Sequence, residues 1–248
     1  MRRDVYALRD FYAGRLGAVV RDVVAGKLTE AWDDARGLDV LGLGYPTPYL
    51  DLFRRSARRV CAAMPALQGA EIWPGRVNAV ALAEESALPF TNALFDRVLL
   101  IHGLEESVDP LSLLNEARRV MAPSGRIVVV AAARRGLWSR AEHTPFGHGR
   151  PYTRMQLELL LREAELEPTA WSRALFTPPV AFLARWPEPW EQSGPVALAP
   201  FAGLTLIEAV KRTFAPTAKA VVTRARIARP PGVLQPAPTM RRAERSGP

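Results

Sequence analysis

The fold class is decided by the stretch RVLLIH at residues 97–102. Its four central residues are all apolar, which is typical of a parallel strand that helices cover on both faces. A helix is expected from about residue 110, with Asp109 as its N-cap and Pro110 in its first turn. A second continuous apolar run follows at residues 127–130. The sequence therefore predicts a strand, a helix and a second strand, the repeating unit of an α/β sheet.

The same alternation extends along the chain in both directions. Further strands are predicted at residues 38–43, 59–63, 77–81, 171–175 and 219–227. Further helices are predicted at residues 4–25, 28–35, 49–58 and 201–213. One more helix is predicted to begin at the capping box formed by Thr153 and Gln156. Strands that alternate with helices favour an α/β fold with a doubly wound, mostly parallel sheet of seven strands. Ligands of such sheets bind beyond the carboxyl ends of the strands.

A single domain is expected over residues 1–228. Its N-terminal helices occupy residues 1–35, and two lid or insert segments occupy residues 134–152 and 177–215. Residues 229–248 contain five prolines and almost no bulky apolar side chains. A segment of this composition has little apolar area to bury, so we expect a disordered, basic tail.

The composition excludes several classes of protein. Hydrophobic residues make up 48% of the 248 residues and charged residues 23%, which is the balance of an ordinary globular protein. The single cysteine, Cys61, cannot form an internal disulfide, which favours a reducing, cytoplasmic location. The N-terminus becomes polar too early for a secretory signal. The longest apolar run, residues 127–133, is far shorter than the roughly 20 residues that a membrane span needs.

The net charge of +8 is concentrated near the end of the chain. Residues 224–248 contain six arginines and one glutamate, so the remainder is nearly balanced. The whole chain has only three lysines, and this preference for arginine favours a GC-rich bacterial genome over a nucleic-acid function. The sequence contains no module of interleaved aromatic and basic residues, which argues against a nucleic-acid partner.

Several short motifs occur in a characteristic order. They are Leu88-Pro89-Phe90, Phe95-Asp96-Arg97-Val98, His102-Gly103-Leu104-Glu105, Asn115 to Val120, Pro123-Ser124-Gly125-Arg126, and the helix from Gln156 to Ala164. In this order and spacing the chain resembles a class I S-adenosylmethionine-dependent methyltransferase of the type 11 group, related to quinone-biosynthesis methyltransferases. The resemblance covers roughly residues 36–170. It implies a Rossmann-like methyltransferase fold and S-adenosylmethionine as cofactor.

The resemblance also implies a cofactor loop after the first strand. Gly42 and Gly44 match two of the three glycines of the family pattern, and Tyr45 follows them. Proline replaces the third glycine at position 46, and valine occupies the position where the family has an acid. Two glycines in a turn are also typical of an ordinary strand-to-helix connection.

At the end of the second strand the family has an acid that binds the cofactor ribose, but this chain has Met64 there. The loss of such charge-assisted hydrogen bonds costs about 1.5–3 kcal/mol, or one to two decades of affinity. Glu84 matches an acid near the adenine, and Ala87 and Leu88 would border the ring. A solvated Glu84-Glu85 pair is the alternative interpretation of that loop.

The resemblance places His102 beside the expected cofactor and substrate, where it is the candidate general base. The alternative is a hydrogen-bonded histidine at the edge of the core. The segment 134–152 would cover the acceptor as a polar and aromatic lid, or else form a long surface connection. Its candidate substrate-binding residues are Trp138, His143, His148 and Tyr152. No residues have the spacing of metal ligands.

Three functions remain open from the sequence. The first is methyl transfer from S-adenosylmethionine to a small organic acceptor, whose identity the sequence does not reveal. The second is a non-catalytic relative that binds the cofactor weakly or not at all and acts through a protein partner. The third is a nucleic-acid-directed methyltransferase or binder, which only the basic tail suggests.

Overall fold

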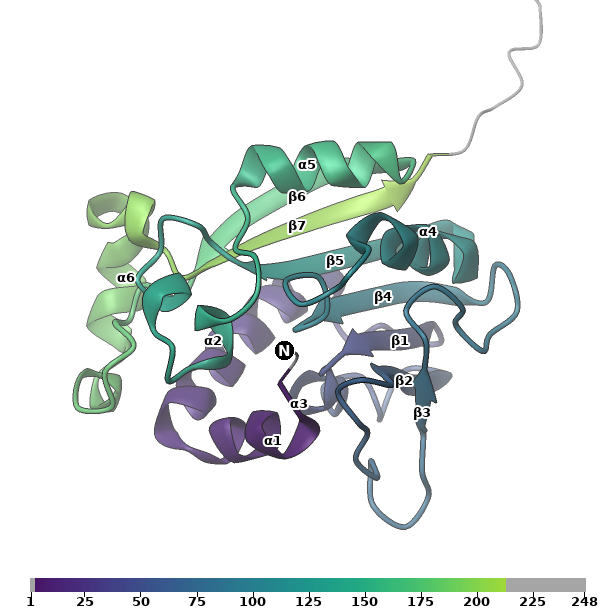
Figure 1. Ribbon diagram of the computed structural model, residues 1–248, viewed down its shortest axis with the longest axis horizontal. Helices are drawn as coiled ribbons and strands as arrows, with labels where there is room; N and C mark the ends of the chain where they lie inside the picture. Colours follow the sequence, from purple (N-terminus) through teal and green to yellow (C-terminus); the bar gives the residue numbers. More distant parts are fainter. Residues whose placement is uncertain (1–2, 213–248) are drawn as a thin grey trace, which may run out of the picture. The chain divides into compact units, whose positions relative to one another are not determined.

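The computed structural model describes residues 3–212, and its centre is one seven-stranded sheet (Figure 1). The strands are β1 (Asp39–Gly44), β2 (Arg59–Pro65), β3 (Val80–Ala83), β4 (Phe95–Ile101), β5 (Met121–Ala132), β6 (Leu166–Ala174) and β7 (Leu204–Lys211). They lie in the order β3-β2-β1-β4-β5-β7-β6. The first five pair in parallel, and β7 is antiparallel to both of its neighbours. The predicted doubly wound, mostly parallel sheet is confirmed.

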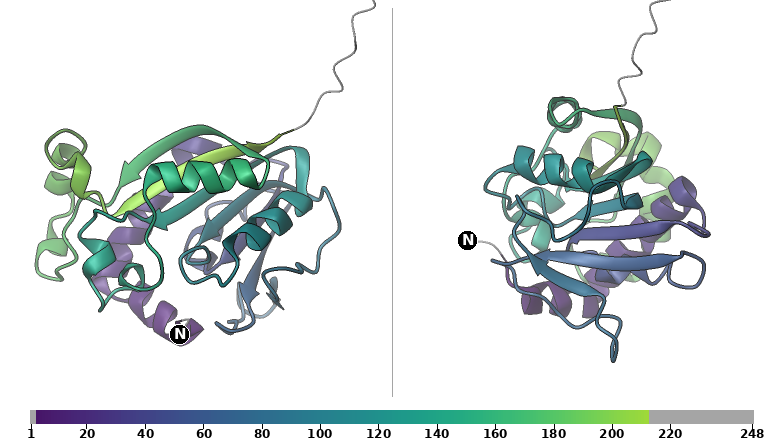
Figure 2. Two further views of the ribbon diagram at one scale, coloured as in Figure 1. Left: turned by 45° about the horizontal axis from the view of Figure 1, so that its top comes forward. Right: turned by 90° about the vertical axis from the view of Figure 1, so that its right-hand side faces the viewer.

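Helices cover both faces of this sheet (Figure 2). They are α1 (Val5–Ala13), α2 (Arg15–Trp32), α3 (Thr47–Leu50), α4 (Pro110–Val120), α5 (Arg154–Glu163) and α6 (Glu188–Ala197). The alternate residues of β4 explain its continuous apolar character. Leu99 and Ile101 pack in one core cluster with α1, α2 and α3, whereas Val98 and Leu100 pack in a second with α4 and α5. No helix within residues 3–212 is long and apolar enough to cross a membrane.

Three helix predictions near the N-terminus need correction. The predicted helix at 4–25 is divided at Gly14, whose backbone is extended with φ −83° and ψ 169°. The residues predicted as a separate helix at 28–35 mostly belong to α2, which continues to Trp32. The predicted helix at 49–58 is reduced to the single turn of α3, after which the chain forms turns up to β2. The two local capping predictions, Asp109 for α4 and the capping box of α5, are confirmed.

The largest correction concerns the last strand. Residues 201–213 were expected to be helical, but residues 204–211 form β7 in the interior of the sheet. Ile207 and Ala209 are fully buried there, between β5 and β6. The apolar residues of this segment are compatible with either a helix or a strand, and the pairing with both neighbours decides for the strand. The predicted strand at 219–227 and the predicted tail at 229–248 lie outside the described residues.

Candidate functional site

The turn after β1 lies at the carboxyl ends of the central strands, where open α/β sheets bind ligands. Gly44 has φ +88°, and a Cβ atom on it would lie 2.1 Å from the carbonyl oxygen of Ile101. The N–H of Tyr45 donates to the same oxygen over 2.9 Å. The absence of a side chain at Gly44 therefore allows the turn to pack directly against the end of β4.

The space beside Gly42 is also filled by the protein itself. A Cβ atom on Gly42 would lie 2.4 Å from the Cβ and Cγ atoms of Pro46. This proline is the residue that replaces the third glycine of the expected pattern. Its ring packs on the glycine, so the space above Gly42 is taken by a side chain and does not form an open backbone cradle. Tyr45 is buried as well and stacks on Tyr12 of α1, with the ring centroids 5.7 Å apart.

The cofactor position of the family corresponds to a very small cavity in this conformation. The cavity has a volume of about 10 Å³, and Gly44, Met64 and Leu88 are among its lining residues. About 10–15 Å³ admits one water molecule, whereas ligand sites have roughly 300–1,000 Å³. Met64 is fully buried, and no carboxylate lies at the end of β2. The residues as arranged here do not accommodate S-adenosylmethionine.

The carboxylate nearest to this cavity is one residue further along than predicted. Glu84 and Ala87 are both exposed and pair with each other in an isolated β-bridge. Glu85, by contrast, lines the cavity, and one of its carboxylate oxygens accepts a hydrogen bond from the Ser107 hydroxyl over 2.9 Å. Two adjacent glutamates cannot be distinguished from the sequence alone, because the orientation of each depends on the course of the loop.

His102 follows β4 and is buried, with a left-handed backbone conformation at φ +53°. Its Nε2 atom lies 2.7 Å from the hydroxyl of Tyr12, and the ring of Phe146 packs 4.6 Å away. Burial, assisted by the nearby charge of Arg3, lowers the pKa of His102 to about 3. The imidazole is therefore neutral at physiological pH, and a group with so low a pKa is a weak general base.

Tyr12, which the sequence analysis assigned only to an apolar stripe, links α1 to this region. Its hydroxyl contacts both Nε2 of His102 and the hydroxyl of Tyr49, each at 2.7 Å. Burial raises the pKa of Tyr12 well above its ordinary value, so the phenol remains protonated. A buried tyrosine hydroxyl requires a hydrogen-bond partner. The presence of a tyrosine in the apolar stripe is therefore the signal by which the sequence could have indicated the role of Tyr12.

The N-terminal segment closes the same edge of the sheet. The guanidinium of Arg3 contacts the imidazole of His148, and its backbone N–H donates to Glu106 over 3.1 Å. The side-chain amide of Gln68 donates to the carbonyl of Gly44 over 3.1 Å, and the carbonyl of Gln68 accepts from the N–H of Val5. A second cavity of about 10 Å³ remains between Arg3 and His102. The start of the chain is thus connected to both the glycine turn and the end of β4.

The four predicted lid residues do not surround one cavity. Trp138 is fully buried in the core, His143 is exposed, and His148 and Tyr152 are half-buried. Each is hydrogen-bonded to a backbone carbonyl: Trp138 to Thr177, His143 to Pro179, His148 to Glu142 and Tyr152 to Leu104. The segment 134–152 therefore contributes to the core through Trp138. Its two histidines lie nearer the surface and bond to loop carbonyls.

Two of the sequence motifs, Leu88-Pro89-Phe90 and Asn115 to Val120, are joined by hydrogen bonds. The N–H of Leu88 donates to a carboxylate oxygen of Glu116 over 2.8 Å. The guanidinium of Arg119 donates to the carbonyls of Leu88 and Phe90 and holds the pKa of the Glu116 carboxyl below its usual range. These motifs fix the loop after β3 on α4, so part of the resemblance comes from residues that stabilise the fold.

Comparison with known families finds a match in the central part of the chain. The profile of a family described as a methyltransferase domain matches residues 25–129, from within α2 to within β5. The chain is thus similar to a methyltransferase domain over these residues. The residues that close the carboxyl edge of the sheet, Arg3, Tyr12 and Phe146, lie outside the matched range.

Individual proteins are similar to this chain in sequence or in fold. A demethylmenaquinone methyltransferase of Thermus thermophilus is 32% identical over 96 residues, which are 39% of this chain and 37% of that protein. A SAM-dependent methyltransferase of Thermotoga maritima, described as a possible histamine N-methyltransferase, superposes with a TM-score of 0.59 at 18% identity. This alignment covers 84% of this chain and 96% of the other.

A third relative has bound ligands. The 1,6-didemethyltoxoflavin-N1-methyltransferase of Burkholderia thailandensis, solved with 1,6-didemethyltoxoflavin and S-adenosylhomocysteine, gives a TM-score of 0.54 at 18% identity. The alignment covers 83% of this chain and 82% of that protein. At these identities the two solved structures support the fold alone.

Proposed function

We propose that this protein transfers a methyl group from S-adenosylmethionine to a small organic acceptor. The observation that carries the proposal is the family match, because residues 25–129 include β1 to β4 and the loops at their carboxyl ends. The relative that is 32% identical over 96 residues is named a demethylmenaquinone methyltransferase, which favours an organic acceptor over a nucleic acid.

Cofactor binding is expected to be weak and to require a more open conformation. The ribose-binding acid is replaced by the buried Met64, and the cavity at this position has a volume of only about 10 Å³. Gln68 connects the start of α1 to Gly44, so movement of the N-terminal segment would affect the cavity directly. If only a small fraction of the molecules is open, the apparent affinity for the cofactor equals the affinity of the open form multiplied by that fraction.

A second candidate function has a specific observation in its favour. The filled glycine turn, the small cavity and the low pKa of His102 all fit a methyltransferase fold that has lost catalysis and acts through a protein partner. The third interpretation, action on nucleic acid, rested on the basic tail, which lies outside the described residues.

Calorimetric titration with S-adenosylmethionine and with S-adenosylhomocysteine distinguishes the methyltransferase from a relative that does not bind the cofactor. Saturable binding supports the methyltransferase. Met64→Asp or Ala63→Asp restores an acid at the end of β2 and is expected to tighten binding by up to about one to two decades. The matched controls are Met64→Asn and Ala63→Asn, which introduce a polar group of similar size without the charge. Absence of binding at millimolar cofactor, without rescue by either acid, favours the partner-binding candidate.

We also propose a cytoplasmic location. Cys61, on β2, is the only cysteine of the sequence, and burial raises the pKa of its thiol to about 11. A thiol with this pKa is protonated and unreactive at neutral pH, as expected of a structural cysteine. Fractionation of cells that express the native protein would test this location.

A further inference from the structure

A cleft of about 690 Å³ lies at the carboxyl ends of β5 and β6, beside the first turn of α5. Four arginines line it, namely Arg134, Arg135, Arg154 and Arg173, together with a single carboxylate, that of Glu158. Its apolar lining includes Met155 and Pro200. This volume is within the range of small-molecule sites, unlike the small cavities beside Gly44 and His102.

The positive charge of this arginine cleft is poorly neutralised. Glu158 forms an ion pair with Arg154, but within residues 3–212 no carboxylate pairs with Arg134, Arg135 or Arg173. Some arginines elsewhere in the described residues have such partners, whereas others, such as Arg55 and Arg76, form no ion pair with a described carboxylate. Examples of the pairs are Arg36–Asp34, Arg54–Asp51, Arg58–Asp39, Arg118–Glu165, Arg119–Glu116 and Arg126–Glu208. The distinguishing feature of Arg134, Arg135 and Arg173 is that they line one cleft together.

One aromatic ring holds two of these arginines together. The guanidinium of Arg154 lies 3.8 Å from the centroid of Trp171, and that of Arg173 lies 5.2 Å from it. Both are cation–π contacts, which attract each cation to the ring. The guanidiniums of α5 and β6 are thus positioned beside the same indole, although their charges repel each other.

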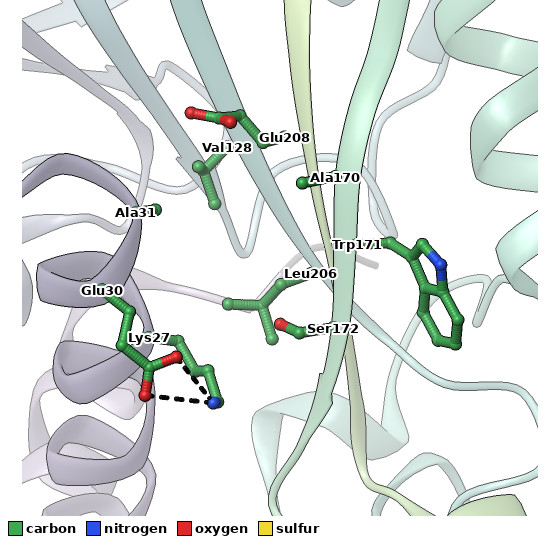
Figure 3. Close-up of a pocket in the computed structure, with 9 residues that line it drawn as sticks. All are labelled: Lys27, Glu30, Ala31, Val128, Ala170, Trp171, Ser172, Leu206 and Glu208. Atoms are coloured by element: carbon green, nitrogen blue, oxygen red, sulfur yellow. Dashed lines mark hydrogen bonds and ion pairs between the residues drawn. The ribbon is translucent and has the colours of Figure 1, made fainter.

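The other face of β6 shows a contrasting arrangement (Figure 3). A cleft of about 310 Å³ between α2 and the sheet includes Lys27 and Glu30, which form an ion pair at 2.8 Å. Ser172 and Leu206 point toward α2, whereas the indole of Trp171 lies on the opposite side of β6. Lys27 is thus neutralised by Glu30, whereas no carboxylate among residues 3–212 pairs with Arg173 on the Trp171 side.

The start of α5 adds to the same positive potential. Arg154 is the first residue of the helix, and the first turn contains no acid. The N-terminal end of a helix carries a partial positive charge, so a cation there is unfavourable and an anion is favourable. The arrangement of α5 and its neighbouring arginines would be stabilised by a negative ligand in the cleft.

We propose that the arginine cleft binds an organic anion that presents two or more phosphate or carboxylate groups. Guanidinium groups bind both kinds of anion through paired N–H···O hydrogen bonds. Arg135 and Arg173 are the principal ligands, because Arg154 pairs with Glu158 and Arg134 donates to the carbonyl of Pro151. Met155 and Pro200 supply apolar surface for the organic part. The proposal uses neither the small cavity beside Gly44 nor His102, although Tyr152 of the expected lid also lines the cleft.

The test is a calorimetric titration of the full chain with pyrophosphate, with citrate and with sodium chloride at matched ionic strength. We expect saturable binding of at least one of the two polyanions, and the comparison identifies phosphate or carboxylate as the preferred group. The double variant Arg135→Gln/Arg173→Gln is expected to weaken binding by at least about tenfold. The control Arg55→Gln/Arg76→Gln removes the same charge from two exposed arginines that do not line the cleft.

A further variant tests the geometry of the cluster. Trp171→Leu leaves the net charge unchanged but removes the ring beside Arg154 and Arg173, so binding is expected to weaken at constant charge. Thermal unfolding of every variant verifies that the domain remains folded. The proposal is overturned if neither polyanion binds saturably, or if the control pair weakens binding as much as the cleft pair does.

Discussion

The hydroxyl of Tyr12 on α1 and Nε2 of His102 at the end of β4 form a buried hydrogen bond of 2.7 Å. The two residues are 90 positions apart in the sequence, and only Tyr12 lies outside the matched methyltransferase domain. The bond connects the N-terminal segment to the strand that borders the expected site. It also keeps the imidazole in a desolvated position, where its protonation is unfavourable.

Removal of the Tyr12 hydroxyl is expected to destabilise the protein. Tyr12→Phe leaves the imidazole of His102 and the hydroxyl of Tyr49 without this partner in a buried position. A buried polar group without a partner costs about 1–3 kcal/mol, so the free energy of unfolding should fall by that amount. Urea titration measures the change. Tyr6→Phe is the control because Tyr6 is exposed, and an equal effect of both substitutions would contradict the prediction.

The low pKa of His102 predicts how stability depends on pH. The folded-state pKa is about 3, below the ordinary value of 6.5, so between these pH values the unfolded chain binds a proton that the folded chain does not. The stabilising contribution of neutral His102 to the free energy of unfolding is therefore fully present above about pH 6.5. It decreases as the pH falls toward 3. The slope approaches about 1.4 kcal/mol per pH unit.

The measurement compares the free energy of unfolding of the wild type and of His102→Asn between pH 7 and pH 4. Asparagine is chosen because it tolerates the left-handed backbone conformation at this position. The variant should be less stable at pH 7 and should lose stability less steeply on acidification. Parallel pH profiles for the two proteins would show that His102 is not buried in the neutral form.

Gly44 is expected to be required for stability as well as for any ligand. Gly44→Ala would place a methyl group 2.1 Å from the carbonyl oxygen of Ile101 at φ +88°, so the turn must move. Strain of this kind costs about 1–3 kcal/mol, which differential scanning calorimetry would detect as a lower melting temperature. Gly26→Ala is the control: it lies in α2 with nothing within 4 Å of its Cβ position and should be neutral or stabilising. Unchanged stability of Gly44→Ala would mean that the turn is more adaptable than this packing implies.

The same geometry changes how a binding experiment should be interpreted. Gly44→Val should impair cofactor binding more than Asp39→Asn does, because Asp39 is at the opposite end of β1, where it pairs with Arg58. Loss of binding in the valine variant would not by itself prove a direct contact with the cofactor, since the substitution also disturbs the junction between β1 and β4. The melting temperature of each variant must therefore accompany its affinity.

The sequence predicted those parts of the fold that depend on local patterns. The apolar run of β4, the N-cap Asp109 and the capping box of α5 each occupy consecutive or nearby residues, so their signals are local. The helix expected at 201–213 was wrong because the identity of β7 depends on its pairing with two strands that are distant in the sequence. Propensity alone does not decide such a short apolar segment.

The site was less predictable because its decisive contacts are tertiary. The sequence indicated a degenerate glycine loop and a missing ribose acid, but not that Pro46 packs on Gly42. It identified His102 as a candidate base, but its partner Tyr12 was recognised only as one member of an apolar stripe. The low pKa of His102 is a consequence of that three-dimensional burial.

The final prediction concerns the N-terminal segment as a barrier to the cofactor. Arg3 contacts His148 and Glu106 across the second small cavity, and Val5 is connected through Gln68 to Gly44. Arg3→Gln should weaken this closure. A loss of about 1 kcal/mol would raise the population of open molecules, and hence the apparent affinity for S-adenosylmethionine, by about fivefold.

Calorimetric titration of Arg3→Gln and of Arg9→Gln provides the comparison. Arg9 lies on the exposed face of α1, where it contacts Asp10 and the ring of the exposed Tyr6, so its removal lowers the net charge without opening the site. Combined with Ala63→Asp, Arg3→Gln should act almost additively, because one substitution changes the open population and the other the contacts of the bound cofactor. If Arg3→Gln and Arg9→Gln bind with the same affinity as the wild type, the N-terminal segment does not restrict access. The weak affinity would then originate in the missing acid and the filled glycine turn alone.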